Sequence, residues 1–127
     1  MRGILRRLLK RIHPEGIPWP GTVLYNALSR SEIFIRHYRI VADDIARYGE
    51  AGAILDIGTG PGQLLLALRD VFPDARLVGV DISQSMVVQA EKNMAQDVRG
   101  RNIEIRLAAA NSLPFDAGTF DRVVSTG

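Results

Sequence analysis

The sequence predicts an α/β protein with a parallel β-sheet of strand order 3-2-1-4 and helices on both faces. Short apolar segments with the length of strands alternate with longer segments whose apolar residues recur every three to four positions. The first of these strands also continues into a glycine-rich turn and then a helix, which is typical of a βαβ unit. Because such crossovers have a fixed hand, the segments after residue 53 give the order 3-2-1-4.

The chain begins with a segment that is predicted to form a basic amphipathic helix, residues 1–12. Its apolar residues fall on one helical face and its first eleven residues include no acid, although the net charge of the whole chain is only +2. The favoured interpretation is a helix packed on the domain or on a partner subunit. Contact with a membrane surface or with nucleic acid is the alternative. The face consists of Ile4, Leu5, Leu8, Leu9 and Ile12.

Residues 13–21 contain three prolines and two glycines, which predict an irregular arm. We therefore divide the chain into residues 1–21, a helix and arm, and residues 22–127, the domain proper. Residues 22–30 are expected to form a short helix. Ser29 and Glu32 have the spacing of a capping box, and the following helix is expected to end at Gly49.

The remaining elements alternate along the chain. Strands are predicted at residues 53–57, 76–81, 103–107 and 120–125. Helices are predicted at residues 63–72, where Pro73 ends the first of them, and at residues 84–98. No internal repeat interrupts this order.

A glycine-rich turn follows the first strand, with Gly58, Gly60 and Gly62 at alternate positions. Such a turn leaves backbone N–H groups at a helix N-terminus, where they attract an anion or an electron-rich ligand edge. The fingerprint of dinucleotide-binding proteins would place a third glycine at position 63, where this chain has Gln63, so a dinucleotide-binding protein is disfavoured. Asp81 ends the second strand about 20 residues later, a position suited to accept hydrogen bonds from ribose hydroxyls.

Four segments together resemble the class I S-adenosylmethionine-dependent methyltransferases, a Rossmann-like family. They stand in the family's order, and the resemblance covers residues 53–127. The segments are Asp-Ile-Gly-Thr-Gly-Pro-Gly at 56–62, Val-Gly-Val-Asp-Ile-Ser at 78–83, Leu-Pro-Phe at 113–115 and Phe-Asp-Arg-Val-Val-Ser at 120–125.

The resemblance implies that S-adenosyl-L-methionine is the cofactor and that its methyl group moves to an acceptor by in-line displacement. The methionyl end of the cofactor would lie along Gly58, Thr59, Gly60 and Gly62. Asp56 would order this loop and face the amino group of the cofactor. Asp81 would bind the ribose beside Ser83, and Ile82 and Met86 would pack against adenine. Ala109 stands where the family often has an acid, so the main chain of Ala110 or the side chain of Asn111 would replace that contact.

The family fold has seven strands, whereas the fourth predicted strand ends near the last residue, Gly127. The expectation is therefore a fragment that holds the cofactor but not the acceptor, with no catalytic residue assignable. Such a fragment is expected to self-associate, because its last strand would be an apolar edge. The alternative function is a nucleoside-binding module without turnover.

Composition excludes several other classes. The hydrophobic share of 46% and the charged share of 24% are those of a globular domain, and without cysteine there are no disulfides and no thiolate chemistry. No metal-ligand pattern and no strong nucleic-acid signal is present. A cytoplasmic protein with an unidentified methyl acceptor is expected.

Overall fold

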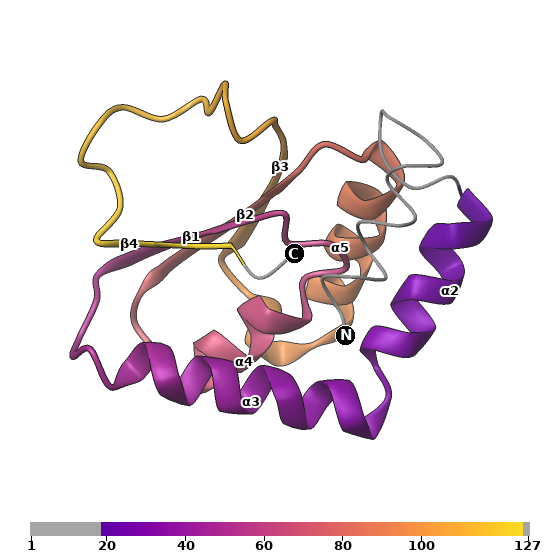
Figure 1. Ribbon diagram of the computed structural model, residues 1–127, viewed down its shortest axis with the longest axis horizontal. Coiled ribbons are helices and arrows are strands. Elements are labelled where there is room, and N and C mark those ends of the chain that lie inside the picture. Colours follow the sequence, from indigo (N-terminus) through magenta and orange to yellow (C-terminus); the bar gives the residue numbers. More distant parts are fainter. Residues whose placement is uncertain (1–18, 126–127) are drawn as a thin grey trace.

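The computed structural model describes residues 19–125, so the predicted basic helix and most of the predicted arm, residues 1–18, lie outside it. In chain order the elements are α2 (Trp19–Ser29), α3 (Glu32–Ala46), β1 (Ala53–Ile57), α4 (Gln63–Val71), β2 (Arg76–Asp81), α5 (Gln84–Gln96), the 3-10 helix η1 (Val98–Gly100), β3 (Ile103–Leu107) and β4 (Arg122–Val124) (Figure 1). Within the described range no helix has both the length and the apolar character needed to cross a membrane.

The four strands form one parallel sheet with the order β3-β2-β1-β4, as predicted. Register partners on neighbouring parallel strands point to the same face, so Ile54 and Leu77 share one face and Leu55 and Val78 share the other. The carboxyl ends of β1 and β2 lie next to each other. Consequently the glycine loop after β1 lies beside Asp81 at the end of β2.

One face of the sheet, the one that carries Ile54 and Leu77, packs against the helices. Residues 64–68 of α4 are all buried, because this helix lies between the sheet and α3. From α3, Tyr38 and Ala42 enter the same cluster. Tyr38 is therefore a core residue, which is the usual role of an aromatic side chain at helical spacing.

The opposite face of the sheet differs from the prediction, since no helix among residues 19–125 covers it. Both βαβ crossovers are right-handed and step in the same direction, from β1 to β2 to β3, which puts α4 and α5 on one side. Residues 108–120 cover the second face instead (Figure 1). Leu113, Phe115 and Phe120 from this segment pack on Leu55 and Val78.

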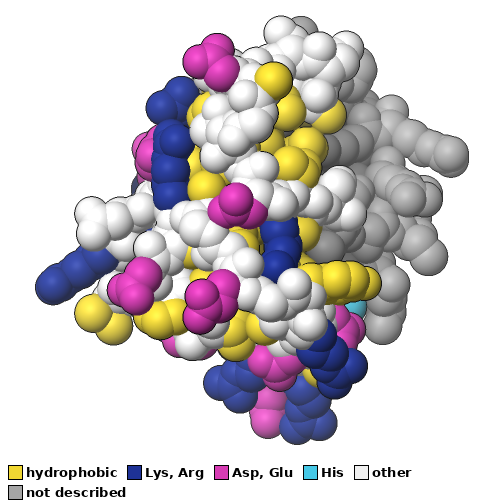
Figure 2. Space-filling view, turned by 90° about the vertical axis from the view of Figure 1, so that its left-hand side faces the viewer, with side chains coloured by type: hydrophobic (Ala, Val, Ile, Leu, Met, Phe, Trp, Pro, Cys, Tyr) yellow, Lys and Arg dark blue, Asp and Glu magenta, His cyan; other side chains and the backbone are white. Residues whose placement is uncertain are grey.

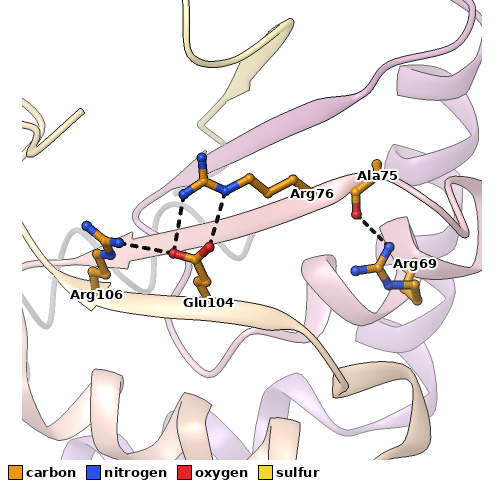
Figure 3. A network of polar contacts seen from close by, with 5 residues as sticks. All are labelled: Arg69, Ala75, Arg76, Glu104 and Arg106. Atoms are coloured by element: carbon orange, nitrogen blue, oxygen red, sulfur yellow. Dashed lines mark hydrogen bonds and ion pairs between the residues drawn. The ribbon is translucent and has the colours of Figure 1, made fainter. Parts of the chain in front are cut away.

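A polar ladder crosses this second face near its edge (Figure 3). Glu104 of β3 accepts a hydrogen bond from Arg76 Nε of β2 at 3.2 Å and pairs with Arg106 Nη2 at 3.2 Å. The hydrogen bond from Arg76 lowers the pKa of Glu104 below its ordinary value, against the opposing effect of burial. The two guanidinium groups also lie 5.7 Å from the ring centroid of Phe120 and 5.1 Å from that of Phe115.

The start of α2 corrects one prediction. The helix begins at Trp19, inside the segment expected to be irregular, and includes Pro20 and Gly21 in its first turn. Proline is compatible with the first turn of a helix, because the N–H that it lacks would have no intrahelical partner there.

The junction between α2 and α3 corrects a second prediction, that of a capping box. Ser29 does not form the predicted capping box with Glu32, because its hydroxyl donates to the carbonyl oxygen of Asn26 at 2.8 Å. Ser31 is the N-cap residue of α3, without a side-chain cap bond. Ser29 is 2% exposed, so its hydroxyl is satisfied inside the preceding helix instead.

The edge strand β4 leads to a prediction about the purified 127-residue chain. Val123 is 57% exposed on this edge, and Figure 2 shows hydrophobic side chains among charged ones on this side of the molecule. We expect concentration-dependent self-association in sedimentation velocity, and we expect Val123→Lys to reduce it, because lysine on an edge opposes strand pairing. Val88→Lys, at a 42% exposed position on α5, is the matched control. Equal effects of both variants would contradict a role for the edge.

Candidate cofactor site at the ends of β1 and β2

The glycine loop, residues 58–62, joins β1 to α4. Gly58, Gly60 and Gly62 have φ angles of 76°, 57° and 88°. These values lie in the left-handed region, which residues with a Cβ avoid. Three alternate glycines are therefore required by the backbone path itself, as the sequence pattern predicted.

The N–H groups of this loop form hydrogen bonds within the protein. Gly58 and Thr59 both donate to the carbonyl oxygen of Val80, at 2.8 Å and 2.9 Å. Gly60 donates to Asp81 Oδ2 at 3.0 Å, and Gly62 donates to the Thr59 carbonyl oxygen at 3.1 Å. These bonds attach the loop to the end of β2, so its conformation is fixed without a ligand.

Asp56 lies beneath the loop. Its Oδ2 accepts a hydrogen bond from Thr59 Oγ1 at 2.8 Å, and both side chains are fully buried. A hydrogen bond to a carboxylate is stronger than one between neutral groups. Asp56 therefore holds the loop in shape, which is the ordering role that the sequence analysis gave it.

Asp81 joins the two loops of the site. Its Oδ2 accepts from Gly60 N–H, and its Oδ1 accepts from Ser83 N–H at 3.0 Å. An ionised carboxylate only accepts hydrogen bonds, and these two bonds fix the orientation of both oxygens. Asp81 is 1% exposed, so its carboxylate lies inside the protein.

The start of α5 contains the other predicted contacts of this loop. Ser83 is the N-cap residue of α5, and its Oγ accepts a hydrogen bond from Met86 N–H at 3.3 Å. Ile82 is half-buried, whereas Met86 is fully buried and belongs to the inner side of α5. Ile82 is thus the better placed of the two to meet a ligand.

The turn after β3 holds the positions predicted near adenine. Ala108 N–H donates to the carbonyl oxygen of Asp81 at 3.0 Å, which brings this turn to the site. Ala109 and Ser112 form an isolated bridge, and between them Ala110 and Asn111 are exposed. Both predicted residues are therefore at the surface, two to three positions beyond the contact with Asp81.

Two glycines of the site have roles that the motif alone did not predict. A Cβ on Gly79 would lie 2.6 Å from Leu65 Cδ1 and 2.7 Å from Thr59 Oγ1, so β2 leaves space for the loop only because this residue is glycine. A Cβ on Gly62 would lie 2.8 Å from Met94 Cε. The positions of Thr59 and of the N-terminus of α4 thus depend on residues that have no side chain.

A hollow of 560 Å³ lies at the opposite, amino end of the strands and is lined by several arginines. Three of these guanidinium groups have partners: Arg69 donates to three carbonyl oxygens, including that of Ala75 (Figure 3), Arg76 binds Glu104, and Arg99 binds two carboxylates. Three of its four arginines therefore serve to hold the surrounding elements together. Among residues 19–125, no group of three His, Cys, Asp or Glu side chains is placed to hold a metal ion.

The fold and the loop geometry agree with comparisons to known proteins. Residues 54–127 match the methyltransferase domain family, and the chain belongs to it. This family is one of class I, S-adenosylmethionine-dependent enzymes with a Rossmann-like fold, and S-adenosylmethionine is its cofactor. The resemblance found in the sequence is therefore confirmed.

Relatives support the same family. A malonyl-[acyl-carrier protein] O-methyltransferase of Geobacter sulfurreducens is 40% identical over 90 residues, which are 69% of this chain and 32% of that protein. A ubiquinone/menaquinone biosynthesis C-methyltransferase of Syntrophotalea carbinolica is 35% identical over 94% of this chain and 46% of its own length.

A solved structure agrees as well. A Methanococcus maripaludis protein assigned to the S-adenosyl-L-methionine-dependent methyltransferases is 30% identical, with a TM-score of 0.79 over 85% of this chain and 49% of that one. The chain spans about a third to a half of the length of the curated relatives named here.

Proposed function

We propose that this chain carries the cofactor-binding part of an S-adenosylmethionine-dependent methyltransferase, with the cofactor over the glycine loop and the ends of β1 and β2. The observation that carries the proposal is the bridge made by Asp81. Its two oxygens accept from Gly60 N–H and Ser83 N–H, so that the loops after β1 and β2 form one unit. A bound nucleoside with a charged tail would lie across both loops.

The donor pattern favours this cofactor over a dinucleotide. A pyrophosphate needs backbone N–H donors, and those of Gly58, Thr59, Gly60 and Gly62 are engaged within the protein. S-Adenosylmethionine has no phosphate and requires only close approach to the loop, which glycine permits. An ionised carboxylate at Asp81 only accepts hydrogen bonds, which suits the two hydroxyls of its ribose.

The cofactor, when bound, supplies a methyl group that is electrophilic because it is attached to a sulfonium. The chain's own residues bind and orient: the glycine loop holds the methionyl end, Asp81 holds the ribose, and Ile82 with Ala110 or Asn111 borders adenine. No covalent nucleophile is needed for such a transfer, because alignment of donor and acceptor supplies much of the rate.

The relatives named above are a malonyl-[acyl-carrier protein] O-methyltransferase and a ubiquinone/menaquinone biosynthesis C-methyltransferase. We propose that the methyl group passes to a small-molecule or macromolecular acceptor. Binding of the nucleoside without turnover is the second candidate. Release of S-adenosylhomocysteine in the presence of an acceptor separates the two. A cytoplasmic location remains a prediction from the sequence.

Calorimetric titration of the purified chain tests the cofactor assignment. We expect S-adenosylmethionine and S-adenosylhomocysteine to bind at least about tenfold more tightly than NAD, which corresponds to about 1.4 kcal/mol. The physical reason is the lack of free loop donors for a pyrophosphate. Tighter binding of NAD would overturn the proposal.

A further inference from the structure

Asn93 connects three parts of the molecule that are distant in sequence. It lies in α5 and is 5% exposed. Its side-chain nitrogen donates to the carbonyl oxygen of Pro61 in the glycine loop at 2.9 Å and to Asn26 Oδ1 of α2 at 2.8 Å. Its oxygen accepts from Gln89 Nε2 at 3.2 Å. One buried amide therefore joins α2 to the loop.

The orientation of both amides follows from chemistry. A carbonyl oxygen only accepts, so Asn93 must turn its NH₂ group toward Pro61. The second hydrogen of that NH₂ group points to Asn26, which must then present its oxygen. The connection thus needs a donor at position 93 and an acceptor at position 26.

A second connection joins α2 to the other loop of the site. Thr22 Oγ1 lies 2.5 Å from Ser85 Oγ, and Ser85 Oγ lies 3.0 Å from Ser83 Oγ. Ser83 in turn donates its backbone N–H to Asp81. α2 and α5 lie side by side in Figure 1, so α2 reaches the glycine loop through Asn93 and Asp81 through the two serines.

The described contacts that attach α2 are largely polar. Its buried side chains, among those described, are Thr22, Tyr25 and Ser29, of which only Tyr25 is large and apolar. Val23 and Leu24 on its other side are 46% and 55% exposed. Among the described contacts of α2 the polar ones are therefore prominent, so we expect the loss of one polar connection to shift its docking equilibrium measurably.

We propose that Asn93 is a positioning residue that couples the docking of α2 to the conformation of the glycine loop, so that cofactor binding and α2 docking strengthen each other. The proposal rests on the proposed function, because the ligand is S-adenosylmethionine or its product. Coupling of this kind is reciprocal: bound ligand slows the opening of α2, and a less stably docked α2 lowers the affinity for the ligand.

The test uses two isosteric variants that carry the same change of charge. Asn26→Asp keeps the acceptor that Asn93 needs, whereas Asn93→Asp replaces the donor with an oxygen that faces the Pro61 carbonyl. Asn26→Ala removes the link to α2 without adding a charge and leaves the bond to Pro61. Hydrogen exchange of the α2 amides is measured with and without S-adenosylhomocysteine, and affinity is measured by calorimetry.

We expect S-adenosylhomocysteine to slow α2 exchange in the unmodified chain and in Asn26→Asp. In Asn93→Asp the affinity is expected to fall by about tenfold or more, and the protection of α2 is expected to be lost. Asn26→Ala is expected to lose the protection with a smaller fall in affinity. Circular dichroism confirms that each variant is folded, and Asn26→Ala tests the coupling even if Asn93→Asp does not fold.

Two kinds of failure are distinguishable. If the unmodified chain does not bind S-adenosylhomocysteine at all, the proposed function is overturned, and the coupling with it. If the ligand binds but leaves α2 exchange unchanged, or if Asn26→Ala retains full protection of α2, the coupling alone is overturned. Faster α2 exchange in ligand-free Asn26→Ala than in ligand-free Asn26→Asp supports the Asn93 connection independently of any cofactor.

Discussion

Asp81→Ala is expected to weaken S-adenosylhomocysteine binding by about a hundredfold or more, because two charge-assisted hydrogen bonds of about 1.5–3 kcal/mol each are lost. The same change removes the acceptor of Gly60 N–H and of Ser83 N–H. Both loops of the site then lose their shared anchor. The effect on affinity should therefore exceed that of any single substitution at the adenine side, and calorimetry measures it.

Two further variants make this experiment specific. Asp74→Ala removes an exposed carboxylate near the other end of β2. We expect it to leave the affinity unchanged, which would show that the loss of affinity in Asp81→Ala does not come from the change in overall charge. Asp81→Asn retains an acceptor for one N–H but loses the charge, so an intermediate affinity is expected. An Asp81→Ala variant that is folded and binds within threefold of the unmodified chain would show that Asp81 does not hold the ribose.

Gly79→Ala is expected to destabilise the fold by about 1–3 kcal/mol, the usual cost of adding an atom to a full core. The added Cβ would meet Leu65 and Thr59 at distances that real Cβ atoms do not reach. Moving Thr59 breaks its bond to Asp56 and distorts the loop. The variant should therefore lose both thermal stability and cofactor affinity.

Val78→Ala provides the comparison for the loss of stability. Val78 is fully buried on the opposite face of β2, and its truncation costs about 2 kcal/mol through lost burial and a cavity. It leaves Thr59 in place, so affinity measured where the protein is folded should be unchanged. If Gly79→Ala and Val78→Ala lower affinity equally, the loss reflects general destabilisation and not the loop.

Sequence patterns were sufficient for much of the fold. The strands and their order followed from apolar segments, turn residues and the fixed hand of crossovers, and all four strands are present. The positive φ angles of Gly58, Gly60 and Gly62 followed from their spacing. These features are local or obey a rule that holds for all parallel sheets, which is why a single sequence reveals them.

The tertiary structure alone decided how the site is connected. Asn26 and Asn93 are 67 positions apart and Thr22 and Ser85 are 63 apart, so no periodicity marks them as neighbours. The use of the loop N–H groups by Val80 and Asp81 was also hidden, since it depends on the register of β1 against β2.

The role of Gly79 and the placement of every described helix on one face likewise depend on what packs opposite them. Local propensity determines which residues form an element. Which polar groups meet, and which position has no room for a Cβ, is determined only when those elements pack at near-crystalline density.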